Sequence, residues 1–203
     1  MTVETGRLAP DAVRRMFDRI APVYDGMNRV MTAGLDRRWR AETARAVVSP
    51  GDRVLDSCCG TGDLAIASLR AGGRVTGLDF SERMLERARA KSDQVEWVQG
   101  DALALPFDDG EFERIFTSYF YCHLEDADRT RFLAEARRVA PELVVVASVP
   151  GAGDPLERFE ERLLKDGSRW TVYKRVFTGD QLAAELGGGV VLHEGRWFVV
   201  VRA

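Results

Sequence analysis

The chain has 203 residues, 45% of them hydrophobic and 30% charged, and its 29 Lys and Arg residues nearly balance 32 Asp and Glu residues. This length predicts one domain that can bury a sizeable core without disulfides or a metal. The formal charge of −3 argues against a nucleic-acid-binding protein that depends on a strong basic field. No apolar run approaches the ~20 residues of a membrane span. Because no apolar signal core stands at the start, we expect a cytoplasmic protein.

The cysteines and histidines form no metal-ligand pattern. Cys58 and Cys59 are adjacent and Cys122 is remote, while His123 and His193 are far apart in sequence. We therefore expect neither a disulfide framework nor a metal site. The adjacent cysteines are expected to be small packing residues rather than reactive thiols.

The first 50 residues are strongly charged and have helical patterning. Residues 11–20 place apolar side chains at helical spacing, with Asp11 as the expected N-cap. A short second helix is expected after Pro22. A third is expected over residues 35–48.

From Arg53 onward, short apolar strands alternate with amphipathic helices. The expected strands cover 53–59, 74–80, 95–102, 112–120 and 142–149, and the helices between them cover 63–73, 81–92 and 126–140. Regular alternation of this kind predicts a parallel sheet with crossover helices.

The last 50 residues follow a different pattern. We expect helices over 155–167 and 178–189, then two strands within 190–202. The two-residue turn Glu194-Gly195 between these strands predicts an antiparallel hairpin. A parallel sheet that ends in such a hairpin differs from the all-parallel dinucleotide-binding sheet.

Residues suited to cofactor binding follow the first three strands. Gly60 and Gly62 lie between a strand and a helix, where glycine lets the backbone approach a ligand closely. Asp79 ends the second strand, where an acid can bind both hydroxyls of a ribose. Asp101 ends the third strand and can accept a hydrogen bond from an adenine amine, while the backbone of Ala102 can meet a ring nitrogen.

Two cofactors fit this pattern: a nicotinamide dinucleotide and S-adenosylmethionine (SAM). A pyrophosphate loop usually reads Gly-x-Gly-x-x-Gly, but Cys58 and Ala65 stand where its first and third glycines would be. The missing first glycine weakens the dinucleotide alternative, and Asp101 favours SAM. In a third alternative, Asp56, Asp79 and Asp101 only form turns. That is less favoured because three acids end successive strands at the edge where ligands bind.

Three motifs resemble those of class I SAM-dependent methyltransferases: VLDSCCGTGDLA, VTGLDFSERML and GDALALPF. The segment from Phe17 to Asn28 resembles the opening signature of the ubiquinone/menaquinone biosynthesis C-methyltransferases. The resemblance covers about residues 15–140 and implies a single-domain α/β, Rossmann-like methyltransferase fold. Its mostly parallel seven-stranded sheet would end in a C-terminal antiparallel hairpin. Residues 1–50 would form an N-terminal helical cap on a SAM-binding core of residues 51–203.

Carried over residue by residue, the resemblance implies a set of contacts with SAM. Tyr24 and Met27 would cap the cofactor, with core packing as the alternative. The remaining contacts would come from Cys58, Gly60 and Gly62 at the methionine end, Asp79 at the ribose, Phe80 and Met84 beside the adenine, Asp101 with Ala102 at the adenine edge, and Ser118 after the fourth strand. For Met84, packing is an equal alternative.

The chain departs from the quinone enzymes at several positions. Cys122-His123 replaces an Arg-Asn pair, Asp36 replaces a His of the opening signature, and Ala140-Pro141-Glu142 is a shortened turn before the fifth strand. These departures fall where the substrate should bind and leave the cofactor motifs unchanged.

His123 and Tyr119 are the candidate catalytic residues. An unperturbed His titrates near ~6.5, so His123 could take a proton from a phenol or hydroxyl. The alternative is a helix-start His bonded to backbone. Tyr119, Phe120 and Tyr121 would form a wall beside a flat or apolar acceptor, with core packing explaining at least one of the three. Trp170, Tyr173 and Lys174 are candidates for closing the substrate side, with packing as the alternative for the aromatics.

The sequence thus predicts transfer of a methyl group from SAM to carbon or oxygen of a small aromatic, phenolic or quinol-like metabolite. S-adenosylhomocysteine (SAH) would be the product, and no metal would be needed. The partner would be a small molecule rather than a nucleic acid, with no integral membrane segment, and the protein would be a monomer or homodimer. The alternatives are a nicotinamide oxidoreductase, a SAM-binding protein without transfer, and a SAM-assisted rearrangement enzyme.

Overall fold

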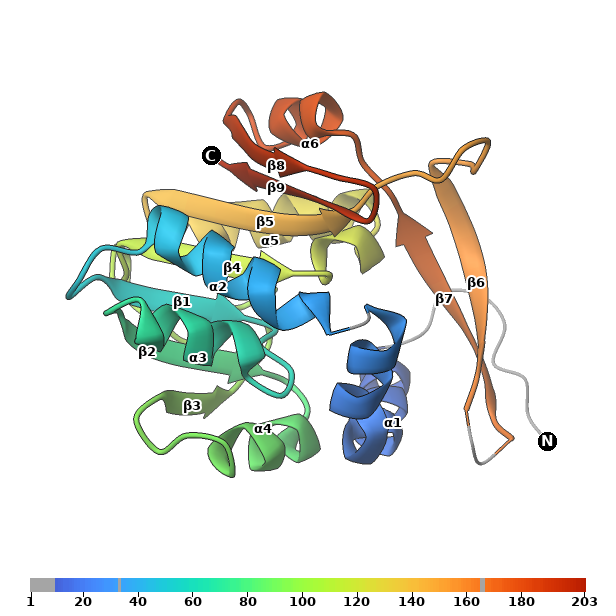
Figure 1. Cartoon of the computed structure of the whole chain (residues 1–203), viewed down its shortest axis with the longest axis horizontal. Helices are drawn as coiled ribbons and strands as arrows, with labels where there is room; N and C mark the ends of the chain where they lie inside the picture. The colour runs from blue at the N-terminus through green and yellow to red at the C-terminus, as the bar shows by residue number, and fades with distance from the viewer. Residues whose placement is uncertain (1–9, 33, 165–166) are drawn as a thin grey trace.

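The structure is a computed structural model that describes residues 10–32, 34–164 and 167–203, and Figure 1 shows the arrangement of their helices and strands. The helices are α1 (Pro10–Met31), α2 (Leu35–Val47), α3 (Asp63–Arg70), α4 (Glu82–Arg89), the short 3-10 helix η1 (Tyr121–His123), α5 (Asp126–Val139) and α6 (Gly179–Glu185). The strands are β1 (Arg53–Ser57), β2 (Arg74–Asp79), β3 (Glu96–Gln99), β4 (Arg114–Ser118), β5 (Glu142–Ser148), β6 (Glu157–Leu163), β7 (Arg169–Arg175), β8 (Val190–Glu194) and β9 (Phe198–Arg202).

Within the described residues, seven strands form one sheet in the order β3-β2-β1-β4-β5-β9-β8. Strands β1 to β5 are parallel, β9 is antiparallel to β5, and β8 is antiparallel to β9. The expected mostly parallel sheet with a terminal antiparallel hairpin is confirmed. Because parallel strands all end at one edge, the segments that follow β1, β2 and β4 come together there.

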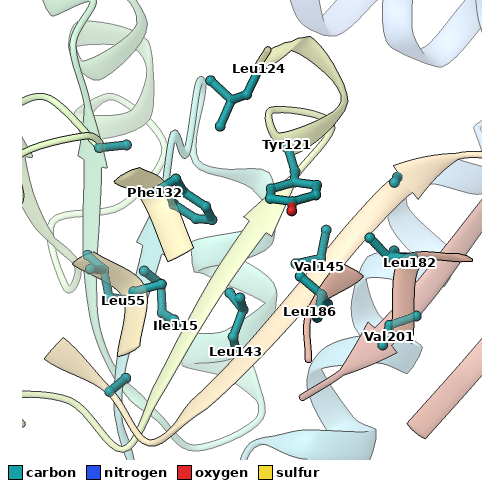
Figure 2. Packing of buried hydrophobic residues seen from close by; sticks show 14 of the residues in the cluster. Leu55, Ile115, Tyr121, Leu124, Phe132, Leu143, Val145, Leu182, Leu186 and Val201 are labelled. Atoms are coloured by element: carbon teal, nitrogen blue, oxygen red, sulfur yellow. The ribbon is translucent and has the colours of Figure 1, made fainter. Parts of the chain in front are cut away.

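The sheet is covered on both faces. Residues of β5 alternate between two apolar clusters: Val144 joins the one that contains Trp39 of α2, and Val145 joins the other. Figure 2 shows part of the second cluster, where Val145 packs with Phe132 of α5 and Leu182 of α6. Burial on both faces explains why the sequence of β5 is apolar almost throughout.

The helix expected over residues 155–167 is wrong, because residues 157–163 form strand β6. This segment is rich in Glu, Arg and Leu, which favour helices by intrinsic propensity. In the structure, all seven residues of β6 pair antiparallel with β7, and Arg158, Glu160 and Arg162 share one half-buried face. Tertiary pairing overrides the local propensity. We call strands β6 and β7 together the arm.

The N-terminal segment also differs from the expectation. A single helix, α1, runs from Pro10 through Pro22 to Met31, so the expected second helix after Pro22 is wrong, and Asp11 lies inside the helix rather than at its N-cap. Proline inside a helix cannot donate a hydrogen bond to the carbonyl four residues earlier. Packing of the residues on either side of Pro22 holds the helix continuous.

Helix α1 and the arm lie together at the edge where the parallel strands end (Figure 1). Met16 of α1 packs with Trp170 and Val172 of β7 in a small apolar cluster. The arm leaves the sheet after β5 and returns at Phe177, whose N–H donates to the carbonyl of Ser148 at 2.9 Å. The arm therefore helps to build the outer wall of the space above the strand ends.

Candidate active site

A cleft of about 2210 Å³ lies between the carboxyl ends of the parallel strands, helix α1 and the arm. Ligand pockets are commonly about 300–1,000 Å³, so this cleft has room for two small molecules side by side. Its lining includes Asp79 and Asp101 at the sheet edge, Tyr24 of α1, and Arg162 and Lys174 of the arm.

The loop after β1 is shaped by three residues with positive φ: Cys58 at 58°, Gly60 at 56° and Gly62 at 81°. The carboxylate of Asp79 accepts hydrogen bonds from the backbone N–H of Gly60 at 2.8 Å and of Ser81 at 2.9 Å. Burial raises the pKa of Asp79 to about 6, although these hydrogen bonds favour the ionised form. Asp79 thus fixes the loop and presents a carboxylate to the cleft.

Gly62 does not line the cleft, in contrast to the contact that the sequence predicted for it. A Cβ at this position would lie 2.4 Å from Cη2 of Trp97 and 3.1 Å from Cβ of Ala88. The N–H of Gly62 donates to the carbonyl of Cys59 within the turn. Gly62 stands directly before α3, and its lack of a side chain allows the turn to pack closely against Trp97 of β3.

The expected adenine-side residues lie together in the lining: Phe80, Met84, Asp101 and Ala102. Met84 is almost completely buried and packs against α1, as the packing alternative predicts, and its contact with the adenine stays a prediction. Oδ1 of Asp101 accepts a hydrogen bond from the backbone N–H of Leu103 at 2.9 Å, which fixes the carboxylate at the cleft.

Two hydrogen bonds fasten α1 to the cofactor motifs. Thr61 of the glycine loop donates to Oδ1 of Asp25 at 2.5 Å, and Ser81 donates to Oδ1 of Asp18 at 2.6 Å. Oδ2 of Asp25 also pairs with Lys91 at 2.8 Å. Sequence reasoning gave these acids no role, although both lie in the opening segment that carried the family resemblance.

The two expected capping residues of α1 both line the cleft. A Cβ added to Gly60 would lie 3.9 Å from Cε1 of Tyr24, so the tyrosine ring sits over the glycine loop. Burial raises the pKa of Tyr24, which is therefore protonated near neutral pH. Met27 is 41% exposed at the cleft, so core packing does not account for it.

The lining continues along Ser118, the last residue of β4, and Tyr119 and Phe120 after it, and also includes Cys58. Tyr119 has φ of 58°, and its ring packs edge-on against Trp39 at 6.0 Å between centroids. Burial raises the pKa of Tyr119 to about 12, so the phenol stays neutral. Among the described residues, the buried Oγ of Ser118 has no hydrogen-bond partner.

His123 also lines the cleft, but its protonation differs from the expectation. Its Nδ1 lies 2.8 Å from the carbonyl of Tyr173, so Nδ1 carries the proton and donates it in this hydrogen bond. Nε2 is then an acceptor, 3.5 Å from Nη2 of Arg162. Burial and the charges of Arg162 and Lys174 lower the pKa of His123 to about 4. The pKa near 6.5 that we assumed for His123 from the sequence therefore does not apply. Nδ1 is bonded to a backbone carbonyl, as in the alternative that the sequence left open.

Three further residues were singled out in the sequence: Asp56, Cys58 and Cys59. Asp56 is buried outside the cleft lining; burial raises its pKa to about 7, and its Oδ2 has no partner among the described residues. Burial likewise raises the pKa of the Cys58 and Cys59 thiols. Within the part of the chain that the structure describes, no group of three His, Cys, Asp or Glu side chains could hold a metal. Nor does any described helix have the length and apolar character needed to cross a membrane.

Similarity to solved structures supports the fold. The complex of DhpI with SAM and HEP has a TM-score of 0.78 and 22% identity, covering 98% of this chain and 99% of that chain. The Burkholderia thailandensis 1,6-didemethyltoxoflavin-N1-methyltransferase has a TM-score of 0.71 and 18% identity, covering 99% and 92%. With the strand order, these likenesses define a class I methyltransferase fold. The chain belongs to the ubiE/COQ5 methyltransferase family, whose model matches residues 5–146.

Relatives with curated names are quinone methyltransferases. The 2-phytyl-1,4-naphtoquinone methyltransferase of Synechococcus elongatus is 43% identical over 122 residues, covering 55% of this chain and 52% of the relative. A chloroplastic 2-phytyl-1,4-beta-naphthoquinone methyltransferase of Arabidopsis thaliana is 41% identical, covering 62% and 52%. The demethylmenaquinone methyltransferase of Clavibacter sepedonicus is 42% identical, covering 54% and 46%. The chain thus spans about half the length of the curated relatives that it matches.

Proposed function

We propose that this protein is a methyltransferase that moves a methyl group from SAM to carbon or oxygen of a small aromatic, phenolic or quinol-like acceptor. One observation carries the proposal: the glycine loop, Asp79 and Asp101 meet at the edge of a cleft whose opposite wall is α1 and the arm. The cleft is large enough for a cofactor and an acceptor together.

The residues at the sheet edge fit SAM. Asp79 offers a fixed carboxylate for the ribose hydroxyls, Phe80 and Met84 offer apolar surface for the adenine, and Asp101 with Ala102 offers an acceptor and a backbone group for its edge. Bound SAM supplies an electrophilic methyl on a sulfonium. The names of two similar structures, the DhpI–SAM–HEP and DhpI–SAH complexes, support this cofactor.

The acceptor would lie between the segment after β4 and the arm. Tyr119 and Phe120 provide aromatic surface there, and the phenol of Tyr119 stays neutral. Nε2 of His123 can accept a hydrogen bond from an acceptor hydroxyl and orient it, because Nδ1 is fixed on Tyr173. Holding two reactants close and aligned can supply up to ~7–11 kcal/mol of the barrier reduction in favourable cases. The names of the relatives support a quinone-like acceptor.

The test is transfer of a labelled methyl from SAM to a panel of quinols, phenols and extracted metabolites. We expect label in an organic-extractable product, and no label above background with Asp79→Asn at limiting SAM. His123→Asn keeps an acceptor oxygen and should lower kcat with little change in SAH affinity. Measurable SAH binding with no labelled product from any acceptor would refute methyl transfer.

Three further predictions go with this proposal. The first is the division into a helical cap of residues 1–50 and a core of residues 51–203, although the arm shares the capping position with α1. The second is a monomer or homodimer, and the third is a cytoplasmic location. Light scattering at several concentrations checks the oligomeric state.

A further inference from the structure

The arm places an excess of positive charge inside the cleft. Arg158, Arg162 and Lys174 all line the cleft, beside the single carboxylate of Glu160. Glu160 pairs with Arg158 at 2.8 Å and with Lys174 at 3.5 Å, and these three side chains are only 21–28% exposed. Asp154 lies 3.8 Å from Arg158 and is half exposed.

Arg162 is the cation of this group that forms no ion pair among the described residues, although its charge, with those of Lys174 and Arg158, lowers the pKa of Glu160. Among the described residues, no carboxylate lies within ion-pair distance of its guanidinium. Its guanidinium lies 3.5 Å from Nε2 of His123, which is a neutral acceptor at the limit of hydrogen bonding. A half-buried charge without a partner is costly, so a ligand with a negative charge would bind here favourably.

The positive field reaches the acceptor side of the cleft. The charges of Arg162 and Lys174 both lower the pKa of His123, while Glu160 acts weakly in the opposite direction. His123 follows the carboxyl end of β4 and η1 packs on β7, so the arm lies beside the segment that carries Tyr119 and Phe120.

We propose that Arg162 and Lys174 form an anion subsite at the acceptor end of the cleft, which binds an oxyanion carried by the acceptor, as in a carboxylate or a phosphate ester. This proposal rests on the proposed function and names the acceptor class more closely: an aromatic molecule with an acidic group. The planar fork of Arg162 suits two oxygens of such a group, and Lys174 adds a second charge.

Equilibrium binding to the full chain saturated with SAH tests the subsite without relying on turnover. The probes are 1-naphthoate, 1-naphthyl phosphate and the neutral isostere 1-naphthamide. We expect the preferred anion to bind about tenfold more tightly than the amide, as charge-assisted hydrogen bonds predict. Whichever anion binds more tightly identifies the oxyanion as carboxylate or phosphate.

Variants then assign the preference to the named residues. Arg162→Gln should bring the affinity for the anion close to that for the amide, and Arg162→Lys should retain part of the difference. Arg169→Gln is the matched control, because Arg169 lies on the same arm outside the cleft and pairs with Glu161. Thermal midpoints of all variants confirm that they fold.

Three outcomes would overturn the proposal. The first is equal binding of the amide and both anions. The second is an equal loss of anion binding in Arg162→Gln and Arg169→Gln. The third is a tenfold weaker SAH affinity in Arg162→Gln, which would assign the arginine to the carboxylate of the cofactor. An anion preference without methyl transfer would instead refute only the proposed function.

Discussion

Asp56 and Asp79 are two buried carboxylates on neighbouring strands with different surroundings. Asp79 accepts two backbone N–H groups and lines the cleft, whereas Oδ2 of Asp56 has no partner among the described residues and the side chain lies outside the lining. Burial raises the pKa of both groups. We therefore expect Asp79 to affect ligand binding and Asp56 to affect the pH dependence of stability.

Asp79→Asn should weaken SAH binding by about 10- to 100-fold, because a hydrogen bond to a charged group contributes about 1.5–3 kcal/mol. Titration calorimetry measures the change. The control is Glu82→Gln, which removes an exposed carboxylate paired with Arg89 on α4. Equal SAH affinities in Asp79→Asn and the wild type would contradict the ribose-binding role.

The affinity for SAH should also depend on pH through Asp79. Its pKa of about 6 means that the carboxylate becomes protonated as the pH falls through that value. Ribose hydroxyls donate to the ionised form, so the dissociation constant should rise about tenfold from pH 7 to pH 5. Asp79→Asn should have a flatter profile over this range, and an unchanged slope would assign the titration to another group.

Asp56 should make the folded state less stable as the pH rises. Its folded pKa of about 7 lies above its unfolded value, so the native state holds the extra proton below pH 7 and loses this stabilisation as the pH rises through 7. Relative to Asp56→Asn, the wild type should lose about 1 kcal/mol between pH 6 and pH 8. Urea unfolding at both pH values measures the difference, and parallel pH profiles would exclude Asp56 as the source.

At the scale of elements, α1 is fastened to the cofactor motifs by a few polar contacts. Asp25→Asn removes the ion pair with Lys91 and weakens the bond from Thr61. Contacts of this kind contribute about 1–2 kcal/mol, so SAH should dissociate about tenfold faster. Stopped-flow displacement measures this rate. Arg53→Gln, which breaks an exposed pair with Glu113 outside the cleft lining, should leave the rate unchanged. An equal effect of both variants would contradict the role of Asp25 in holding α1.

The elements of the parallel sheet could be predicted because their patterns are local. Apolar strands, stop signals and helical stripes stand in the same few residues that form each element. The arm could not be predicted in this way, because Glu160 and Arg162 have helical propensity and their strand conformation depends on pairing with β7. Likewise α1 continues through Pro22, and the residues on either side of it, Ala21 and Tyr24, pack with Met84 of α4, which is remote in sequence.

The residues of the candidate site also differ in whether the local sequence could predict them. Asp79 and Asp101 could be predicted because the ends of parallel strands meet at one edge. Gly62 lines no part of the cleft, since its position depends on Trp97 from a different strand. Arg162 carried no signal because it reaches His123 only once the arm has folded back over the strand ends. The state of His123 depends on that same arm.

At the scale of the whole molecule, SAH should stabilise the cleft wall more than the sheet. A ligand at 100 times its dissociation constant raises the free energy of unfolding by about 2.7 kcal/mol, which a thermal midpoint reports. Hydrogen exchange should slow most in α1 and the arm, because these elements face the ligand and pack on each other through Met16 and Trp170. Slowing confined to α3 and the strands would show that the outer wall does not respond to cofactor.

The segment that contains the arm leaves the sheet at the end of β5 and returns to the same place. The N–H of Phe177 donates to the carbonyl of Ser148, and the N–H of Val176 donates to the carbonyl of Leu156. An excursion closed at its base can be exchanged for one of different length or charge while β5 and α6 keep their places. We therefore expect that a segment grafted between Ser148 and Phe177 would change the acceptor that is used and leave the edge with Asp79 and Asp101 as it is.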